Sequence, residues 1–179
     1  MTARASVNTR RLFFASWPDA RQRDALWSVI QGLCPVPVGK PVPAGNLHVT
    51  LAFLGNVADD QMPALRDVAA SHTWPESDFG FDRLAWWRRA KLLCLEASSL
   101  PATLDTAVVA FHEDLRRAGF KVDRRPFRAH ITVARNVPSP PAVFSGLPIP
   151  PLAWPLQGMT LVASTPTPEG AVYEVLERF

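Results

Sequence analysis

The sequence predicts an α+β protein with antiparallel strands, and we expect residues 1–179 to form a single domain. The expected helices and strands do not alternate evenly, as they would in a parallel sheet with crossover helices. Pairs of short strands joined by turns recur, and the two halves of the chain follow a similar order. Each half has a helix, a proline-rich or basic connection, a strand containing His-x-Thr, and further strands. This repetition predicts two similar lobes around a central cleft.

The first half is expected to hold two helices and two strands. The helix at 19–33 is predicted by apolar residues at i, i+3, i+4 and i+7, which form one buried stripe. The four prolines of 34–45 exclude regular structure there. The strands are expected at 11–17 and 47–54, and the second helix at 59–72.

The second half is expected to hold one helix between two groups of strands. Ser99 is expected to cap this helix and Gly119 to end it in a left-handed conformation. The proline-dense segment 137–155 predicts a long loop with an edge strand at most. The remaining strands are expected at 79–87, 91–96, 127–134, 158–164 and 171–179.

The charge of the chain permits an anionic substrate. A net charge of +3, from 19 basic and 16 acidic residues, is too small to suggest an avid duplex-binding protein. Two basic clusters stand out, of which we interpret the first as a solvated surface. The second surrounds a candidate site, so a solvated surface and a substrate contact stay equally open for it. The clusters are Arg88, Arg89 and Lys91, and Lys121, Arg124, Arg125, Arg128 and Arg135.

Cysteine usage and the termini indicate a soluble protein. Cys34 and Cys94 have no spacing typical of a zinc site or a disulfide framework, and Cys94 is expected to be buried. Residues 1–9 are expected to form a flexible tail and lack the apolar core of a signal peptide. With no long apolar run either, we expect a cytoplasmic monomer with no membrane contact.

Two strand-like segments, Leu47–Leu51 and Ala129–Val133, share the pattern His-x-Thr with aliphatic residues between the polar ones. Successive side chains of a strand point to opposite faces. Each segment can therefore bury an aliphatic face while it presents an imidazole and a hydroxyl to a cleft. The polar residues are His48 and Thr50 in the first segment and His130 and Thr132 in the second.

Two histidines that face each other suggest an acid and a base, because imidazole can be neutral or protonated near physiological pH. In-line displacement at phosphorus needs one of each. The hydroxyls of Thr50 and Thr132 are placed to stabilise charge on the phosphoryl oxygens, and Arg135 adds a guanidinium. The sequence lacks a carboxylate-rich or His-Glu-x-x-His motif, so we expect no metal and no cofactor.

Other residues near these motifs need separate interpretation. A single His-x-Thr is a weak signal, but two copies 82 positions apart, one in each half, are much more specific. His72 and His112 are expected to be surface histidines. Phe53, which we place on the same face as His48 and Thr50, is interpreted either as a core residue or as a base-stacking residue.

The segments 46–55 and 127–135 resemble the two signature motifs of the 2H phosphoesterase superfamily, most closely the RNA 2′,3′-cyclic phosphodiesterase or 2′-5′ RNA ligase (LigT-like) family. Segments 11–15 and 170–173 resemble that family's opening and closing strands. The resemblance implies a bilobal fold in which two antiparallel sheets face a central cleft, with helices packed outside. It also implies hydrolysis of 2′,3′-cyclic phosphate ends of RNA, tRNA-derived or other, to a 2′-phosphate, with reversible 2′-5′ joining as a side activity.

The resemblance further implies a role for each residue of the site. His48 would be the proton donor and His130 the proton acceptor that activates water, while Thr50, Thr132 and Arg135 would hold the phosphate. One departure is that Ala129 stands where the family usually has proline. The two segments are nearly symmetric, so the acid and base assignment follows from the resemblance alone.

Two alternatives stay open. One alternative is an enzyme that acts on a small cyclic nucleotide or an ADP-ribose-type cyclic phosphate, although the second basic cluster favours a longer anion. The other is an RNA-end binding module without turnover, although such a module has no need for a second matched proton-transfer group.

Overall fold

The computed structural model describes residues 8–33, 38–139, 147–156, 158–168 and 170–179. The expected tail at 1–9 lies outside these residues except for its last two, and Thr9 already begins the first strand. Cys34 also lies outside them. The Cys94 side chain is buried, as predicted.

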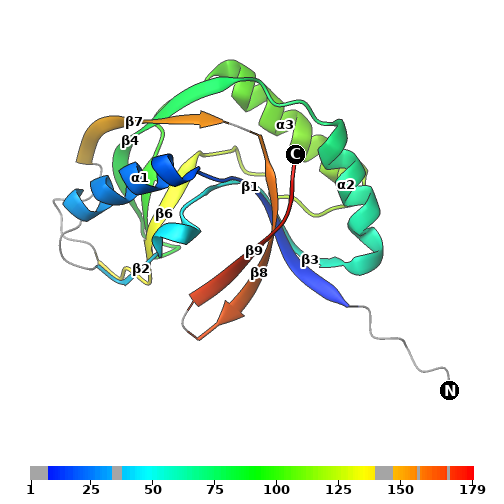
Figure 1. The fold of residues 1–179 in the computed structure, drawn as a ribbon, viewed down its shortest axis with the longest axis horizontal. Helices are drawn as coiled ribbons and strands as arrows, with labels where there is room; N and C mark the ends of the chain where they lie inside the picture. Colours follow the sequence, from blue (N-terminus) through cyan, green and yellow to red (C-terminus); the bar gives the residue numbers. More distant parts are fainter. Residues whose placement is uncertain (1–7, 34–37, 140–146, 157, 169) are drawn as a thin grey trace.

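Nine strands among the described residues form one antiparallel sheet in the order β7-β4-β5-β6-β3-β1-β8-β9, with β2 paired to β6 (Figure 1). β4 and β5 form one hairpin and β8 and β9 another, and all the strand pairings are antiparallel, which confirms the predicted antiparallel class. The strands are β1 (Thr9–Ser16), β2 (Lys40–Pro41), β3 (Val49–Ala58), β4 (Ser77–Trp87), β5 (Leu92–Glu96), β6 (His130–Arg135), β7 (Leu147–Leu156), β8 (Thr160–Thr167) and β9 (Gly170–Arg178).

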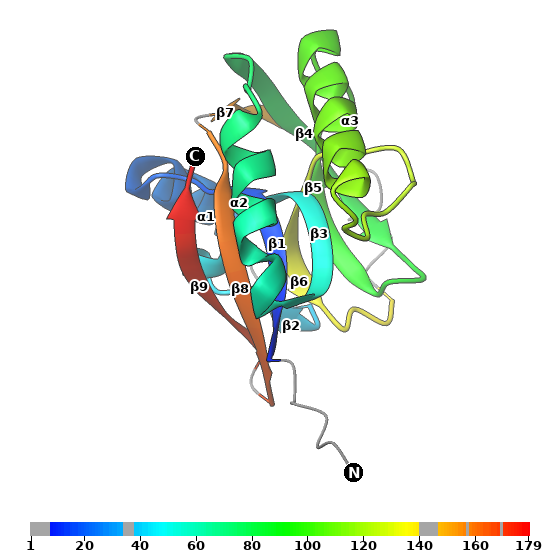
Figure 2. The ribbon, with the colours of Figure 1, turned by 90° about the vertical axis from the view of Figure 1, so that its right-hand side faces the viewer.

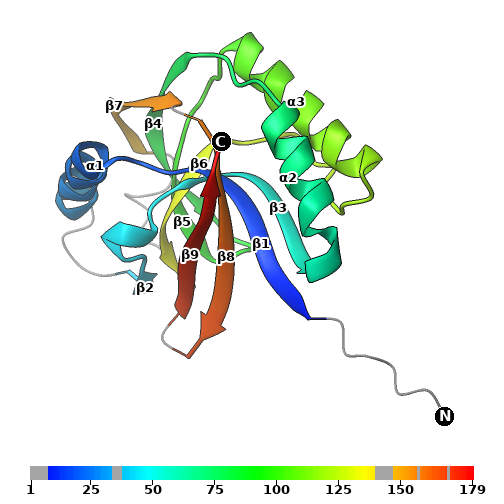
Figure 3. The same ribbon diagram turned by 45° about the vertical axis from the view of Figure 1, so that its right-hand side comes forward.

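Where two separate sheets were expected, hydrogen bonds join the two halves into one sheet. The junction is short, because β3 and β6 are paired only through Val49 and Ile131. On either side of it the β3-β1-β8-β9 half and the β7-β4-β5-β6 half fan apart (Figure 3). The single pair explains why the sequence suggests two lobes although the strands form a continuous sheet.

Among the described residues three α-helices cover the sheet, namely α1 (Ala20–Leu33), α2 (Met62–Ser71) and α3 (Ala102–Arg117). Helices α2 and α3 lie side by side, whereas α1 lies apart from them (Figure 2). All three contribute buried apolar residues to one core together with Leu12 and Phe14 of β1. No helix in the described part of the chain is long and apolar enough to cross a membrane.

The ends of α3 correct one prediction and confirm another. The helix begins at Ala102 after Pro101, and no side chain caps it, so the expected capping by Ser99 is wrong. At its end Gly119 has φ +91°, and the Phe120 amide donates to the Leu115 carbonyl at 2.9 Å. This is the left-handed termination that glycine favours.

The proline-rich segments contain more regular structure than expected. Within 34–45, β2 pairs with β6, and a 3₁₀ helix starts at Ala44. Short pairing survives there because the Val42 amide, which is not a proline, donates to the Val133 carbonyl at 2.8 Å. β7 lies at the edge of the sheet, as predicted, and an edge strand tolerates residues that lack an amide donor.

Two irregularities in β3 decide which side chains reach the cleft. Along the β1–β3 pairing, Ala15 faces Thr50 and Phe14 faces Ala52, so Leu51 is an extra residue on β3. Strict alternation from Thr50 would turn Phe53 to the opposite face, and this bulge brings it back to the face of Thr50. A second shift lies beside Gly55, which has φ +71°, and β3 continues past the predicted end to Ala58.

The predictions for the two other histidines are wrong. His112 is only 9% exposed, and its Nε2 donates to the carbonyl of the bulge residue Leu51 at 2.7 Å. The imidazole therefore supplies the donor that the sheet cannot give this carbonyl. The His72 side chain is also mostly buried and packs against Trp74 and Phe111.

Candidate active site

The junction between β3 and β6 brings the two His-x-Thr motifs together. Val49 and Ile131 are paired partners, and both are fully buried. In an antiparallel pair centred on them, each histidine comes opposite the threonine of the other motif, and all four polar side chains lie on the face away from the core. His48, Thr50, His130, Thr132 and Arg135 line one cleft of about 580 Å³.

The polar contacts of His48 fix its orientation. Its Nδ1 lies 2.8 Å from the Asn46 carbonyl oxygen, and its Nε2 lies 3.1 Å from the Thr50 hydroxyl oxygen. A carbonyl can only accept, so Nδ1 carries the proton in neutral His48. The Nε2 atom then accepts from the hydroxyl and lies on the side of the cleft.

Aromatic rings enclose the imidazole of His48. Trp17 stacks on it with ring centroids 5.0 Å apart, Phe13 lies at 5.0 Å, and Tyr173 meets it edge-on at 5.3 Å. Burial lowers the pKa of His48 to about 4, and the backbone hydrogen bond to Asn46 opposes this effect only in part. In the absence of an anion the residue is therefore neutral at physiological pH.

His130 repeats the local geometry of His48. Its Nδ1 donates to the Arg128 carbonyl at 2.8 Å, which is again the carbonyl two residues earlier, and its Nε2 is left for the cleft. The Trp87 ring lies against the imidazole, with centroids 4.4 Å apart. Burial lowers the pKa of His130, while the backbone hydrogen bond to Arg128 and the negative charge of Glu96 oppose that change.

Phe53 belongs to the cleft and not to the core. The ring is 43% exposed, and the Arg11 guanidinium lies over it at 4.7 Å from the centroid. Both side chains line the cleft. The core interpretation of Phe53 is therefore wrong, while its contact with a nucleobase stays a prediction.

Sequence reasoning missed the aromatic residues that surround the two imidazoles, as well as Arg11. Phe13 and Trp17 lie in a segment that was interpreted only as a strand, and Trp87 immediately precedes the β4–β5 turn. The sequence did contain a signal for Trp17, because a large aromatic side chain at a strand end, next to Pro18, is expected to pack against another side chain. For Trp87 and Tyr173 no local pattern points to a histidine.

The basic clusters differ in their position. Arg88, Arg89 and Lys91 are exposed at the β4–β5 turn, as predicted for a solvated surface. Of the second cluster, Arg135 lines the cleft. Arg125 and Arg128 instead border a second groove of about 440 Å³, which adjoins the cleft. Thr50, Phe53 and His130 line both hollows.

In the part of the chain that the structure describes, no three His, Cys, Asp or Glu side chains gather into a group that could hold a metal ion. The predicted site residues bring two imidazoles, two hydroxyls and a guanidinium to the cleft, and Arg11 adds a second guanidinium. Such a set is suited to moving protons while it binds an anion.

A model of the 2′-5′ RNA ligase superfamily matches residues 18–166, which include both His-x-Thr motifs. The chain belongs to this superfamily. The match agrees with the resemblance inferred from the two motifs alone.

Characterised relatives of the 2′-5′ RNA ligase superfamily resemble the chain over most of its length. It is 32% identical over 187 residues to the RNA 2′,3′-cyclic phosphodiesterase of Thermus thermophilus, covering 94% of this chain and 89% of the relative. It is 32% identical over 127 residues to the protein of the same name from Escherichia coli, covering 71% of this chain and 72% of the relative.

Solved structures of the superfamily share the fold. The crystal structure of E. coli LigT complexed with 3′-AMP has a TM-score of 0.83 at 29% identity and covers 96% of this chain and 98% of LigT. The structure of E. coli LigT complexed with phosphate has a TM-score of 0.78 at 27% identity, covering 96% of both chains. The α+β architecture predicted from the sequence is therefore that of LigT.

Proposed function

We propose that this protein is an RNA 2′,3′-cyclic phosphodiesterase that opens the cyclic phosphate by two-histidine acid and base catalysis. The observation that carries the proposal is the paired geometry of His48 and His130. Each donates Nδ1–H to a backbone carbonyl and leaves its Nε2 to one shared cleft. The relatives named RNA 2′,3′-cyclic phosphodiesterase support the choice of substrate.

In the proposed reaction a water molecule attacks the phosphorus atom as the bond from phosphorus to the ribose 3′ oxygen breaks. Nε2 of His130 takes a proton from the water, and Nε2–H of His48 gives a proton to the departing 3′ oxygen. The products are a 2′-phosphate and a free 3′-hydroxyl. When a 5′-hydroxyl of a second strand takes the place of water, the same steps form a 2′-5′ linkage.

The substrate's own charge prepares His48 for its role. Burial lowers the pKa of His48 in the free protein, and the nearby Arg135 charge lowers it further. A bound phosphodiester places a negative charge beside the imidazole and offsets the Arg135 charge, so the protonated form becomes more favourable. Thr50, Thr132 and Arg135 are proposed to hold the phosphoryl oxygens as charge develops on them.

The direct test is the hydrolysis of an oligoribonucleotide that ends in a 2′,3′-cyclic phosphate. His48→Ala and His130→Ala should each lower turnover by about 10² to 10⁴-fold, as is typical when a general acid or base is lost. His72→Ala is the control, because His72 packs against Trp74 and Phe111 away from the cleft. Turnover at the wild-type level in both cleft variants contradicts the mechanism, and binding without product in the wild type favours the RNA-end binding module.

The acid and base roles can be separated with a substrate whose departing 3′ oxygen is replaced by sulfur. A thiolate departs without protonation, so the acid becomes dispensable while the base does not. Activity of His48→Ala on this analogue should approach that of the wild type, whereas His130→Ala stays inactive. Rescue of the opposite variant would reverse the assignment.

A substrate longer than a mononucleotide is favoured by the groove that adjoins the cleft. This groove is lined by apolar side chains and by Arg125 and Arg128, which also pair with Asp123 and Glu96, and it shares Phe53 with the cleft. A guanidinium suits a phosphate, and an exposed ring suits a base. The ratio kcat/KM should therefore be higher for an oligonucleotide than for a cyclic mononucleotide, and equal values would favour the small-nucleotide alternative.

A further inference from the structure

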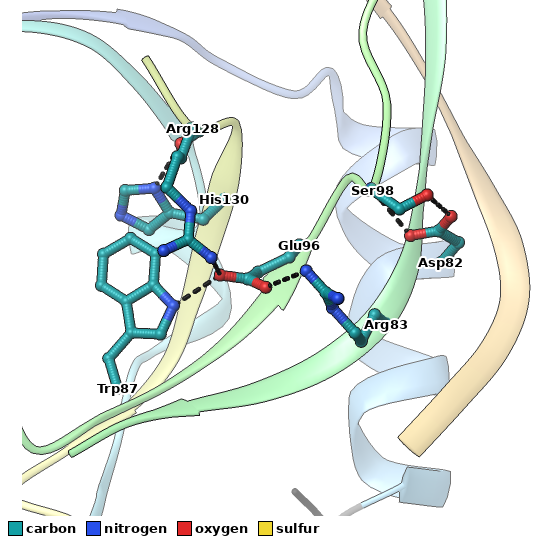
Figure 4. Close-up of polar contacts among 7 residues, drawn as sticks. All are labelled: Asp82, Arg83, Trp87, Glu96, Ser98, Arg128 and His130. Atoms are coloured by element: carbon teal, nitrogen blue, oxygen red, sulfur yellow. Dashed lines mark hydrogen bonds and ion pairs between the residues drawn. The ribbon is translucent and has the colours of Figure 1, made fainter. Parts of the chain in front are cut away.

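A buried carboxylate lies behind one of the two histidines. Glu96 ends β5, is the paired neighbour of His130 on β6, and is only 3% exposed. A charge removed from water is costly unless it is paired and hydrogen-bonded. Glu96 meets this requirement with three donors, which Figure 4 shows converging on its two oxygens.

The donors divide between the two oxygens of Glu96. Arg83 Nη2 donates to Oε2 at 2.7 Å. Trp87 Nε1 and Arg128 Nη2 both donate to Oε1, at 2.5 Å and 2.6 Å. Because Arg83 occupies Oε2, Oε1 accepts from both Trp87 and Arg128 and so connects these two side chains.

The two residues whose side chains meet at Oε1 also contact His130, Trp87 with its ring and Arg128 with its main-chain carbonyl. The Trp87 ring lies against the imidazole of His130, and the Arg128 carbonyl accepts its Nδ1–H. The Arg128 guanidinium also lies over the Trp87 ring, 5.0 Å from its centroid (Figure 4). Glu96 therefore anchors the Trp87 ring that packs on the imidazole, and it holds the side chain of Arg128, whose carbonyl orients that imidazole.

Among the described residues, no carboxylate acts on the His48 imidazole as Glu96 acts on that of His130. That imidazole is enclosed by Phe13, Trp17 and Tyr173, and the charged groups near it are Arg135 and His130. The two motifs have the same local geometry, so the two sites differ in the residues that surround each imidazole. A carboxylate stabilises the imidazolium that forms when a base accepts a proton.

We propose that Glu96 is a positioning residue for His130, which holds Nε2 toward the cleft and favours its protonated form during the reaction. This inference rests on the proposed function and assigns the base side of the site to His130 on structural grounds. The other charged groups around His130 are Arg128 and Arg135, which act against the Glu96 charge. Asp123, in the loop before β6, is paired with Arg125.

The test compares Glu96→Gln with Asp82→Asn. Glutamine keeps the shape and an acceptor oxygen but removes the charge, whereas Asp82 on the neighbouring strand bonds Ser98 and contacts none of the groups that hold His130 (Figure 4). Glu96→Gln should lower kcat/KM on the cyclic-phosphate oligonucleotide about tenfold or more, because small misplacements of a catalytic group are costly. Asp82→Asn should leave it unchanged.

A titration of the imidazole resonances by NMR measures the pKa of each histidine, which would not change if Glu96 had only a structural role. Loss of the Glu96 charge leaves Arg83 and Arg128 uncompensated, so the pKa of His130 should fall in Glu96→Gln while that of His48 stays constant. Lower turnover with an unchanged His130 pKa overturns the proposal, and so does an unchanged turnover. The titration does not depend on turnover, so it still decides the role of Glu96 if the wild type proves inactive on RNA.

Trp87→Phe tests the same connection without touching the carboxylate. Phenylalanine retains an aromatic ring beside His130 but cannot donate to Glu96. The expected result is a loss of kcat/KM in the same direction as in Glu96→Gln, together with a smaller change in the His130 pKa because the charge remains. Wild-type kcat/KM in this variant would contradict the anchoring role of Oε1.

Discussion

Replacing His48 with glutamine is expected to remove a pH-dependent part of the free energy of unfolding. In the folded protein, burial lowers the pKa of His48 from 6.5 to about 4. In the unfolded chain the imidazole is solvated and regains its ordinary pKa. Between these two values the unfolded chain binds a proton that the folded protein does not bind, so acid favours unfolding. The contribution of His48 to stability is present above pH 6.5 and is lost as the pH falls towards 4.

The size of this effect follows from the two pKa values. The difference between 6.5 and about 4 corresponds to about 3 kcal/mol, and about 2 kcal/mol of it is lost by about pH 5. Glutamine does not titrate. The free energy of unfolding of the wild type minus that of His48→Gln should therefore fall by about 2 kcal/mol between about pH 7.5 and pH 5.

Urea denaturation of both proteins at the two pH values measures this difference, provided that the slopes with urea agree. His130→Gln is the matched comparison. Its imidazole has the same backbone contact, but the Glu96 charge opposes the effect of burial, so the pH-dependent change should be smaller. A difference that stays constant with pH for His48→Gln would refute the burial of an uncharged imidazole at this position.

Three further predictions concern the surroundings of the cleft. Gly39 has φ +67°, and a Cβ there would lie 2.4 Å from the Arg135 carbonyl oxygen. Gly39→Ala should therefore displace the Arg135 backbone and raise KM. Gly45→Ala is the control and should leave KM unchanged, because its added Cβ would have no atom within 4 Å. His112→Phe removes the donor to the Leu51 carbonyl and should lower the free energy of unfolding by about 1–3 kcal/mol, measured with urea; an unchanged value would mean that this carbonyl finds another donor. Hydrolysis of the cyclic phosphate should continue unchanged in excess chelator, and its loss would contradict a reaction carried by the two histidines alone.

Much of the fold could be predicted because the spacing of apolar residues along each helix and strand matches the face that it buries. The stripe that contains Leu26 and Ile30 identifies α1, and the aliphatic residues between His48 and Thr50 or His130 and Thr132 identify the buried faces of β3 and β6. An alternating segment that buries one face leaves the other for the cleft. The convergence of both motifs followed from this alternation and from their occurrence in both halves.

The remaining features depend on neighbours that are distant in the sequence. The bulge at Leu51 is stabilised by His112 from α3, 61 positions away, and neither residue alone indicates the other. His112 was predicted at the surface because only its helix was considered, whereas its partner lies on the sheet. Trp87 and Glu96 belong to the predicted hairpin of β4 and β5, but their connection to His130 requires the pairing of β5 with β6.

The two halves of the cleft differ in ways that would let one local motif support the two proposed chemical roles. The same three-residue pattern and the same Nδ1–carbonyl contact present Nε2 from each strand. A pair of identical imidazoles would have no preferred direction of proton transfer. Burial among aromatic rings makes the cation of His48 unfavourable, so in the proposed reaction His48 would be a ready donor once a bound anion has charged it. The carboxylate of Glu96 acts in the opposite sense on His130 and favours the imidazolium that a base becomes. In the proposed mechanism the direction of proton transfer would thus be determined by residues outside both motifs, which is why the motifs alone could not indicate it.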